Sequence, residues 1–492
     1  MKNFFTLGLI LKFLMVIVFY FGDVVINPSG NHYANRNFAT DASGNNLINQ
    51  HISIGSLSDN NLINWGISMD SPGLYPLHKT LDLDWKQIRS VSRRINNDFS
   101  DFDGFEHLES AIAFMLGKYD IKGASVAVAR DGQLVFAKGL GYADAESEEP
   151  VKPAHLFRIA SVSKLITATT IMKMRELDLL DIDDKVFGKD GILNDPVYLN
   201  YADPRVEDIT VRHLLNHSSG WDRRYGDHIA MHYHIARDMQ INNNDLSVTD
   251  ILTFAMKNGL HFDPGSRTSY SNLGYVILGQ IIEAVSGVNY ESYVRKTILL
   301  PLGIQEMRIG GSHLEERFKN EVKYYETAYI PEDHHAYGND RLIPLPYGGN
   351  DIKLLGAAGG WIASPAEIMK LVVSIDTIPD TPNLLSPESI ELMTDTNLSG
   401  GHPIGWAGTD GRGNWWRTGT LSGTSALVMR QNNGISWAVF FNSSTYKGIS
   451  LPRETHKEVH TALNRVKNWP EHNLFYHFES FPYRYPDIAE LR

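Results

Sequence analysis

Cysteine is absent from this chain of 492 residues. Its absence excludes disulfide frameworks, zinc–thiolate sites, iron–sulfur clusters and cysteine nucleophiles. The chain also has no Gly-x-Ser-x-Gly pentapeptide, no Walker A loop and no Gly-x-Gly-x-x-Gly loop. An α/β-hydrolase nucleophile turn and a bound nucleotide cofactor are therefore not expected, and we predict no cofactor.

Positive charge is scarce as well. The chain has 45 lysines and arginines against 57 aspartates and glutamates, which gives a formal net charge of −12. Because nucleic-acid recognition needs clustered positive charge, we expect no nucleic-acid partner. The hydrophobic fraction of 42% is that of a globular protein, and the length predicts either two domains or one large body of two parts.

The chain opens with an apolar segment. Lys2 and Lys12 accompany apolar runs that end at Phe21, a pattern typical of a secretory signal. The uninterrupted run is short for a bilayer-spanning helix, and no small-x-small cleavage site follows Phe21. We predict a signal peptide or an N-terminal anchor over residues 1–22. The expected location is the periplasm, the cell envelope or the extracellular space, with membrane attachment through this segment left open.

Three further regions follow from composition. Asparagine, serine and glycine make up 20 of the 44 residues from 27 to 70, so this stretch has little apolar surface to bury. Residues 23–104 are predicted to be a linker and N-terminal extension. The main domain is placed at residues 105–466, and an aromatic-rich tail at residues 467–492.

Two β-hairpins are predicted at opposite ends of the main domain. Asp131-Gly132 separates two apolar runs near its beginning, and Asn433-Gly434 separates two more near its end. These dipeptides between apolar runs are strong hairpin signals. Strands from both chain ends are therefore expected to form the sheet.

The middle of the domain carries helix signals instead. Ser247 with Asp250 opens a helix that ends before Gly259, and residues 364–367 read as a capping box with proline at the first helical position. The apolar segment 273–285 stops at Gly287, as a buried helix does. We predict an α/β (α+β) fold with an antiparallel sheet built from both chain ends and flanked by helices. A mainly helical subdomain is inserted between them, and a cleft is expected where the two parts meet.

Ser161 and Lys164 form a Ser-x-x-Lys motif at the start of an apolar helix. Residues three apart share a helix face, so the lysine amine can reach the serine hydroxyl. The helix dipole favours developing negative charge at this end, and an apolar setting eases deprotonation of the lysine. Ser161 is therefore a candidate nucleophile and Lys164 a candidate general base.

The chain contains a second Ser-x-x-Lys motif at Ser444 and Lys447. This copy lies at the end of a hairpin strand, close to Pro452, and no long apolar helix is expected behind it. It shows that a motif of this length occurs by chance, so the first copy needs support from other residues.

Two further elements supply that support. Tyr270 and Asn272 stand directly before the apolar helix at Leu273; a phenol can relay a proton, and an amide can position the lysine or a substrate carbonyl. Arg417, Thr418, Gly419 and Thr420 precede the second hairpin. A charged side chain followed by small residues on this strand leaves room for an extended substrate.

The three elements together resemble the penicillin-binding-protein and serine β-lactamase family, in the class C-like branch that includes DD-peptidases, esterases and D-amino-acid peptidases. The resemblance runs from about Phe105 to Val466. It also covers the segment 209–220, which ends His-Ser-Ser-Gly, and the glycine-rich segment 355–361 followed by Ser364-Pro365. It implies a β-lactamase/transpeptidase-like fold.

The resemblance assigns roles residue by residue. It implies that Ser161 is acylated, that Lys164 activates it and that Tyr270 relays a proton to the leaving group. Asn272, Arg417, Thr418 and Gly419 would line the substrate site, and the backbone N–H groups of Ser161 and Thr420 would form the oxyanion hole. The family usually has lysine or histidine where this chain has Arg417, which cannot shuttle a proton but can polarise Tyr270 or grip a substrate carboxylate.

The implied function is that of an exported serine hydrolase acting on amide, peptide or ester substrates, with a small molecule or peptide as its partner. A β-lactamase and a catalytically silent binding or sensor module on the same fold remain alternatives. A metal site at His228, His232 and His234 is a further alternative, because the four-residue spacing would place the first two on one helix face. No zincin glutamate accompanies them, and no metal ligand is assigned.

Replacing Ser161 by alanine, or Lys164 by alanine, is expected to abolish turnover because each removes one half of the activated nucleophile. The measurement is the hydrolysis rate of an ester or amide substrate. Ser444→Ala is the matched control and should leave the rate unchanged. Full activity in Ser161→Ala would contradict the assignment.

Overall fold

The computed structural model describes four short segments near the N-terminus and most of the remaining chain. The described residues are 24–26, 32–35, 51–54, 65–68 and 97–477, without 102, 243–244, 328–332, 335–341 and 379–382. The chain divides into two compact units, Met1–Asp84 with Pro486–Arg492, and Trp85–Tyr485. The predicted signal or anchor over residues 1–22 lies outside the described residues. Within the part of the chain that is described, no helix has the length and apolar character needed to cross a bilayer.

The smaller unit contains a four-stranded antiparallel sheet in the order β1-β2-β3-β4. Its strands are β1 (Val24–Ile26), β2 (His32–Asn35), β3 (His51–Ile54) and β4 (Trp65–Ser68). These strands were not predicted from the sequence. At three or four residues each, they are too short for an alternating pattern to stand out from a polar background.

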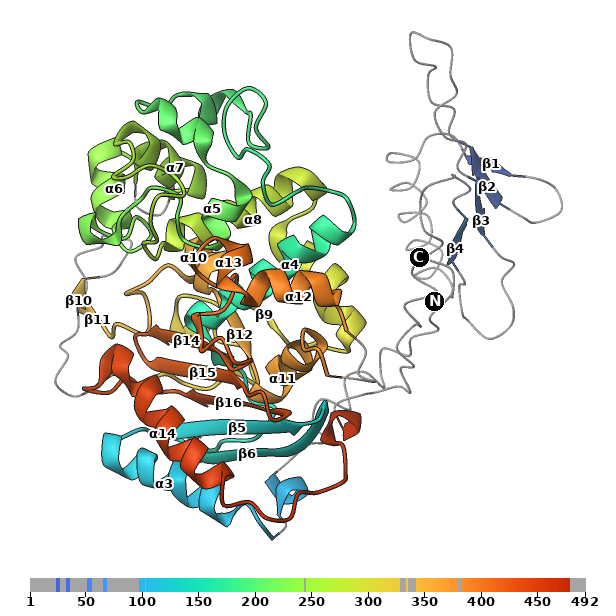
Figure 1. Ribbon diagram of the computed structural model, residues 1–492, viewed down its shortest axis with the longest axis vertical. Coiled ribbons are helices and arrows are strands. Elements are labelled where there is room, and N and C mark those ends of the chain that lie inside the picture. Colours follow the sequence, from blue (N-terminus) through green and yellow to red (C-terminus); the bar gives the residue numbers. More distant parts are fainter. Residues whose placement is uncertain are drawn as a thin grey trace, which may run out of the picture. The chain divides into compact units, whose positions relative to one another are not determined.

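A seven-stranded antiparallel sheet forms the centre of the larger unit, in the order β13-β14-β15-β16-β5-β6-β7 (Figure 1). Its strands are β5 (Gly123–Arg130), β6 (Gln133–Asp144), β7 (Glu149–Pro150), β13 (Gly408–Thr409), β14 (Trp415–Leu421), β15 (Thr424–Arg430) and β16 (Ile435–Phe441). The late strand β16 pairs with the early strand β5, so the expectation of one sheet built from both chain ends is confirmed.

Both predicted hairpins are present. β5 and β6 join through Asp131 and Gly132, which have φ angles of 49° and 78°. Two consecutive positive φ angles are the requirement of a type I′ turn, whose twist matches that of the strands. β15 and β16 join through Asn433 and Gly434, where the glycine φ is 80°.

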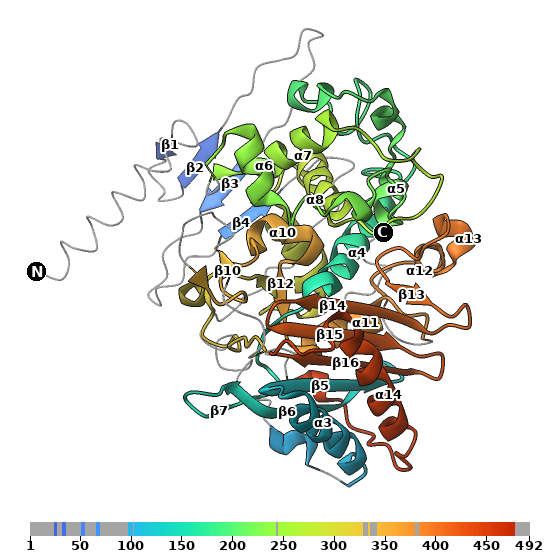
Figure 2. The same cartoon turned by 90° about the vertical axis from the view of Figure 1, so that its left-hand side faces the viewer.

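Helices cover both faces of this sheet. α3 (Glu106–Tyr119) and α14 (Leu451–Leu463) pack on one face, and α11 (Pro365–Ser374) packs on the other (Figures 1 and 2). Two hydrophobic cores result, one beneath α3 and α14 and a larger one that continues from the opposite face into the helical region. This three-layer arrangement buries both sides of the central strands, which explains why β15 is buried along its whole length.

Most of the remaining helices lie between the early and late strands in sequence. They are α4 (Ser163–Glu176), α5 (Val211–Leu215), α6 (His232–Met239), α7 (Val248–Lys257), α8 (Asn272–Ser286), α9 (Tyr290–Val294), α10 (Ile352–Gly359), α12 (Pro387–Thr394) and α13 (Thr396–Ser399). A small sheet of β8 (Phe157–Arg158), β12 (Trp361–Ala363) and β9 (Arg308–Ile309) accompanies them, as does the pair β10 (Asp333–His334) and β11 (Leu342–Ile343). The predicted helical insertion is therefore confirmed.

The predicted helix ends hold with one exception. Ser247 and Asp250 form a full capping box at α7, and α8 ends at Gly287 with a left-handed φ of 67°. At α11 the Ser364 side chain accepts from the Glu367 N–H, but Glu367 does not return the bond. Its carboxylate instead accepts from the backbone N–H groups of Gln305 and Glu306. The capping box predicted there is thus only half formed, because a neighbouring loop competes for the glutamate.

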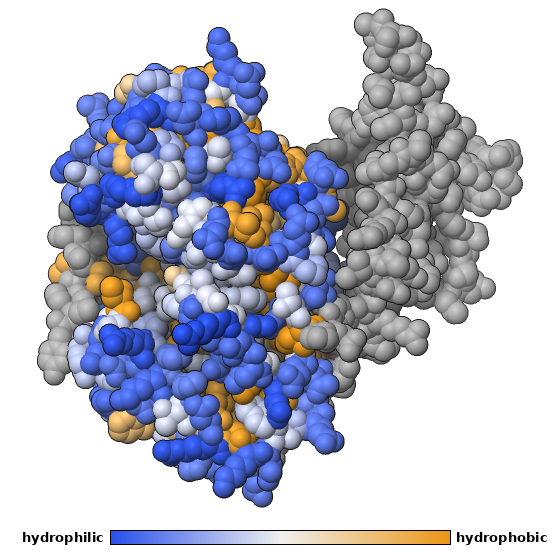
Figure 3. Space-filling view, in the orientation of Figure 1, coloured by the Kyte–Doolittle hydropathy of each residue, from blue (hydrophilic) through white to orange (hydrophobic). Residues whose placement is uncertain are grey.

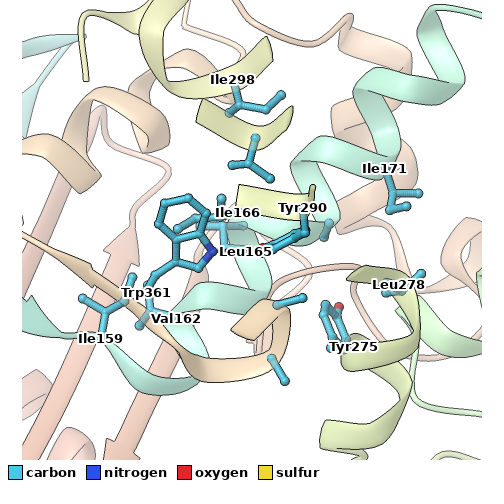
Figure 4. Packing of buried hydrophobic residues seen from close by; sticks show 14 of the residues in the cluster. Ile159, Val162, Leu165, Ile166, Ile171, Tyr275, Leu278, Tyr290, Ile298 and Trp361 are labelled. Carbon is cyan, nitrogen blue, oxygen red and sulfur yellow. Dashed lines mark hydrogen bonds between the residues drawn. The ribbon is translucent and has the colours of Figure 1, made fainter. Parts of the chain in front are cut away.

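The interior around α4 is closely packed. Trp361 and Tyr290 lie beside Leu165 and Ile166 of α4 in Figure 4, and the indole Nε1 of Trp361 donates to the Tyr290 hydroxyl at 2.9 Å. On the outside, the face drawn in Figure 3 is mostly hydrophilic, with apolar residues in scattered patches. Nearly every position of α4 is buried, so this helix acts as a rigid internal support for the residues at its N-terminus.

β7 pairs only with the end of β6, and side chains from both ends of the larger unit cap the free side of the earlier part of β6. Ser100 Oγ accepts from the Ala137 N–H and donates to the Ala137 carbonyl, both at 2.9 Å. Asn97 Oδ1 accepts from the Gly139 N–H, and Asn473 Oδ1 accepts from the Leu134 N–H. Side chains thus satisfy main-chain groups that a further strand would otherwise pair with.

Ser100→Ala is expected to lower the free energy of unfolding by about 1–3 kcal/mol, since it leaves a buried N–H and a buried carbonyl of Ala137 without their partner. Urea unfolding of the purified protein measures the change. Ser147→Ala, at an exposed turn residue, is the control and should alter stability by less than about 0.5 kcal/mol. Equal stability of the two variants would show that the edge cap contributes nothing.

Candidate active site

Ser161 lies on a short 3-10 helix, η2 (Ala160–Val162), that leads directly into α4. The residue before it, Ala160, has a φ of 47°, which is a left-handed conformation that alanine rarely adopts. Such strained residues persist only where the surroundings enforce them, and they concentrate at functional sites. Here β12 supplies the restraint, because the Trp361 carbonyl accepts from the Ile159 N–H at 3.0 Å.

Lys164 lies one turn after Ser161 and is 0% exposed. Its Nζ is 3.3 Å from Ser161 Oγ, 2.6 Å from Asn272 Oδ1 and 2.6 Å from the Ala358 carbonyl oxygen. Burial lowers the pKa of Lys164 to about 8. A neutral amine has two N–H groups, which match the two carbonyl oxygens, and its lone pair then faces Ser161 Oγ. The site is therefore built for a lysine that accepts the serine proton.

Tyr270 stands on the other side of Ser161. Its hydroxyl is 2.6 Å from Ser161 Oγ, and its ring lies 4.9 Å from Lys164 Nζ. Burial acts to raise the pKa of Tyr270, but the positive charges of Lys164 and Arg417 outweigh it and lower the pKa to about 8. A phenol with this pKa can exchange a proton with the serine or with a leaving group near neutral pH.

Asn272 is the first residue of α8, whose N-cap is Ser271. Its side-chain oxygen accepts from Lys164, and its Nδ2 donates to Asp227 Oδ2 at 2.6 Å. The amide therefore bridges the lysine and a carboxylate that the sequence analysis did not identify.

Arg417 extends from β14 and is 1% exposed. Its Nε donates to the Ser161 carbonyl at 2.7 Å, and one of its terminal nitrogens is 3.4 Å from the Tyr270 hydroxyl. Of the two roles that the sequence left open, this geometry favours polarising Tyr270 over gripping a substrate carboxylate, because the guanidinium is buried and already bonded.

Gly419 brings β14 against the turn that carries Ser161. A Cβ at this position would lie on the Ile159 carbonyl oxygen and 3.1 Å from the Ser161 nitrogen. Only glycine permits this approach. Thr418 and Thr420 flank Gly419 on β14. The N–H of Thr420 therefore lies on the part of the strand that approaches Ser161.

Besides Asp227, two residues that contact the site were not predicted individually from the sequence. The Ala358 carbonyl reaches Lys164 from the end of α10, inside the glycine-rich segment that the resemblance had marked. His217 packs its ring 4.6 Å from that of Tyr270, and its Nδ1 accepts from the Ser271 N–H at 3.3 Å. His217 belongs to the His-Ser-Ser-Gly segment. For both Ala358 and His217, the signal present in the sequence was their position inside a segment that resembles a family motif.

The second Ser-x-x-Lys motif has a different environment. Ser444 Oγ accepts from the Gly423 N–H at 2.7 Å and donates to Glu326, and Lys447 Nζ lies 3.7 Å from Glu454. A helix does follow this motif, since α14 begins at Leu451, but it has a polar outer face rather than being apolar throughout. The motif contributes to local hydrogen bonding at the end of a strand.

The three histidines weighed as metal ligands do not share a helix face. α6 begins at His232, so His228 precedes the helix and the spacing argument fails. The His232 ring instead hydrogen-bonds to the Ile229 carbonyl through Nδ1 at 3.0 Å. Among the residues that the structure describes, no group of three potential ligands is arranged to hold a metal ion.

A match to a known protein family covers most of the chain. The sequence matches the Beta-lactamase family over residues 106–457, which is more than half of the chain. The chain belongs to the Beta-lactamase family. The family and the fold predicted from the sequence are thereby confirmed, within the superfamily of serine β-lactamases and penicillin-binding proteins.

Individual members are more distant. Penicillin-binding protein 4* of Bacillus subtilis (strain 168) is 32% identical over 47% of this chain and 45% of its own length, so the chain spans less than half of this curated relative. An octameric penicillin-binding-protein homologue from Pyrococcus abyssi shares 29% identity, with a TM-score of 0.55 over 74% of this chain and 78% of the other. The D-amino acid amidase of Ochrobactrum anthropi SV3, at 21% identity, has a TM-score of 0.58 over 73% of this chain and 99% of its own. The last likeness shows the shared fold.

Gly419→Ala is expected to lower the rate of acylation about 100-fold or more, because the added methyl separates β14 from Ser161 and disturbs the oxyanion donors. The rate of ester or amide hydrolysis measures the effect, with thermal unfolding as the check on folding. Gly117→Ala in α3, where a Cβ meets open space, is the control and should retain the wild-type rate. A folded Gly419→Ala protein with wild-type turnover would contradict the close approach.

Proposed function

We propose that this protein is a serine hydrolase that acts through an acyl-enzyme on Ser161. The observation that carries the proposal is the position of Ser161 Oγ, 2.6 Å from the Tyr270 hydroxyl and 3.3 Å from Lys164 Nζ. A buried amine and a phenol whose pKa values both lie near 8 flank one hydroxyl, which is how a weak nucleophile is activated.

Acylation would proceed by attack of Ser161 Oγ on the substrate carbonyl carbon. The serine proton passes to the neutral amine of Lys164, and the backbone N–H groups of Ser161 and Thr420 stabilise the oxyanion that forms. The bond to the leaving group then breaks, and Tyr270 delivers a proton to the departing nitrogen or oxygen. Tyr270 recovers a proton from the ammonium of Lys164, which restores the amine and leaves an ester on Ser161.

Deacylation would reverse the roles. A water molecule loses a proton to the Tyr270–Lys164 pair as its oxygen attacks the ester carbonyl carbon. The tetrahedral intermediate collapses, Ser161 Oγ takes the proton back, and a carboxylic acid is released. The permanent charge of Arg417 supports both halves of the cycle, since it favours the phenolate form of Tyr270 without exchanging a proton itself.

The proposed substrates are amides or peptides that contain D-residues, or small esters. Support comes from the family, from a neighbour named as a D-amino acid amidase and from a relative named as a penicillin-binding protein. β-Lactamase activity is the second candidate within the same chemistry. A silent binding module is the remaining candidate, and the contacts that join Ser161, Lys164, Tyr270, Asn272 and Arg417 count against it. Export is proposed from the apolar N-terminal sequence.

Exposure of the full-length protein to a penicillin is expected to add the mass of the drug to the wild type and not to Ser161→Ala, because the proposed acyl-enzyme forms on Ser161. Intact-mass spectrometry detects the adduct. Hydrolysis of D-phenylalanine amide, L-phenylalanine amide and a p-nitrophenyl ester by the same two proteins tests the substrate class.

The outcomes separate the candidates. Drug turnover without a lasting adduct indicates a β-lactamase. An adduct, or hydrolysis of the D-amide or the ester, that is lost in Ser161→Ala supports the proposal. If the wild type shows no adduct, no drug turnover and no hydrolysis, the acyl-enzyme proposal is wrong and the silent module takes its place.

A further inference from the structure

Asp227 lies outside the motifs that identify the site, on the loop between η5 (Arg223–Tyr225) and α6. Both of its carboxylate oxygens are engaged. Oδ2 accepts from Asn272 Nδ2 at 2.6 Å, while Oδ1 accepts from the backbone N–H groups of Ile229 at 3.0 Å and Ala230 at 3.4 Å. The carboxylate therefore caps its own turn with one oxygen and binds an active-site amide with the other.

The loop backbone is shaped to present this side chain. Gly226 has a φ of 112°, which is a conformation that side chains oppose, and a Cβ there would collide with the sulfur of Met231. The turn continues through the Asp227 carbonyl, which accepts from the Met231 N–H at 2.9 Å, and leads into α6. Asp227 is thus anchored to the helical subdomain on one side and to Asn272 on the other.

A carboxylate imposes a direction on an amide because it can only accept hydrogen bonds when ionised. Asn272 must turn its Nδ2 toward Asp227, and its Oδ1 then faces Lys164. With an oxygen on that side, the amine donates to Asn272 and keeps its lone pair for Ser161. The reverse orientation would point an N–H at the amine, so the lone pair would be consumed by Asn272 instead of the serine proton.

Asp227 also contributes charge. The titratable groups that face Lys164 are Tyr270, Arg417, His217 and Asp227. Burial and the cation of Arg417 lower the pKa of Lys164, whereas the charges of Tyr270 and Asp227 raise it. Burial keeps His217 neutral by lowering its pKa well below its usual range. The charge of Asp227 thus opposes the effect of Arg417 on the pKa of Lys164.

We propose that Asp227 is a positioning residue of this active site, which fixes the polarity of the Asn272 amide so that the Lys164 lone pair is directed at Ser161. The inference rests on the proposed acyl-enzyme function and goes beyond it, since Asp227 touches neither the substrate nor the nucleophile. It acts on Lys164 through Asn272 and through its own charge.

Asp227→Asn and Asp227→Ala separate this role from a structural one. The side chain of an asparagine at position 227 has one acceptor oxygen, whereas the carboxylate uses one oxygen for the N–H groups of the turn and the other for Asn272 Nδ2. Because the N–H groups of Ile229 and Ala230 take its oxygen, its NH₂ group faces Asn272, and that amide must reverse. Alanine at position 227 removes the hydrogen bond that orients the Asn272 amide, but it does not force that amide into the reverse orientation. We therefore expect kcat/KM to fall about tenfold in Asp227→Ala and about 100-fold or more in the isosteric Asp227→Asn, with kcat carrying most of the loss.

A residue that only supports the loop predicts the opposite order, since the isosteric variant disturbs packing least. A milder loss in Asp227→Asn than in Asp227→Ala, or equal losses, would overturn the proposal. The pH profile gives a second readout. Loss of the negative charge lowers the pKa of Lys164, so the acid limb of kcat/KM shifts to lower pH in both variants, and an unchanged limb would also count against the proposal.

Asp195→Asn is the matched control, because Asp195 caps η3 (Pro196–Leu199) by accepting from the Val197 N–H in the same way. It should keep the wild-type rate and pH profile. Thermal unfolding verifies that each variant is folded at the assay temperature. Failure of the wild type to be acylated or to turn over any substrate defeats the proposed function, whereas normal acylation with the wrong order of variants defeats only the role of Asp227.

Discussion

A lysine amine that is removed from water must find replacement hydrogen-bond partners or lose its charge. Lys164 has such partners, and burial also lowers its pKa. Its partners come from three separate parts of the chain: η2 supplies Ser161, α8 supplies Asn272, and the end of α10 supplies the Ala358 carbonyl. Each partner must be placed to within a few tenths of an ångström, so the helices that carry them need a rigid frame. The buried helix α4 and the sheet beside it provide this frame.

Tyr270 depends on the same arrangement from the other side. A phenol this deeply buried would ordinarily hold its proton more tightly, yet Lys164 and Arg417 reverse the effect. Because guanidinium stays charged at every accessible pH, the contribution of Arg417 does not vary as the lysine titrates. A lysine or histidine at this position could change its charge during the cycle. The arginine therefore keeps one constant positive charge beside Tyr270. In the proposed mechanism, protons move only among Ser161, Lys164, Tyr270 and the reacting groups.

The sequence was informative wherever a local pattern controls the structure. The Asp131-Gly132 and Asn433-Gly434 turns, the end of α8 at Gly287 and the Ser161–Lys164 spacing are local, and each was predictable. The failures involve competition or distance. Glu367 does not complete its capping box and instead accepts from N–H groups of a loop about sixty residues away in sequence. Asp227 binds Asn272, which is 45 residues away, and no motif surrounds Asp227. Pairings of this kind leave no periodic signal in one sequence.

The two edges of the main sheet differ in what they offer to another polypeptide. Along β6, Ser100, Asn97 and Asn473 occupy the main-chain groups, so a passing strand finds no ladder to join and the fold resists edge-to-edge aggregation there. On the opposite side, β13 pairs only with Trp415 and Trp416 of β14. Among the described strands, none lies beside the rest of β14 on that side, next to Ser161. The edge of β14 that has no pairing strand among those described is therefore the one that lies beside Ser161.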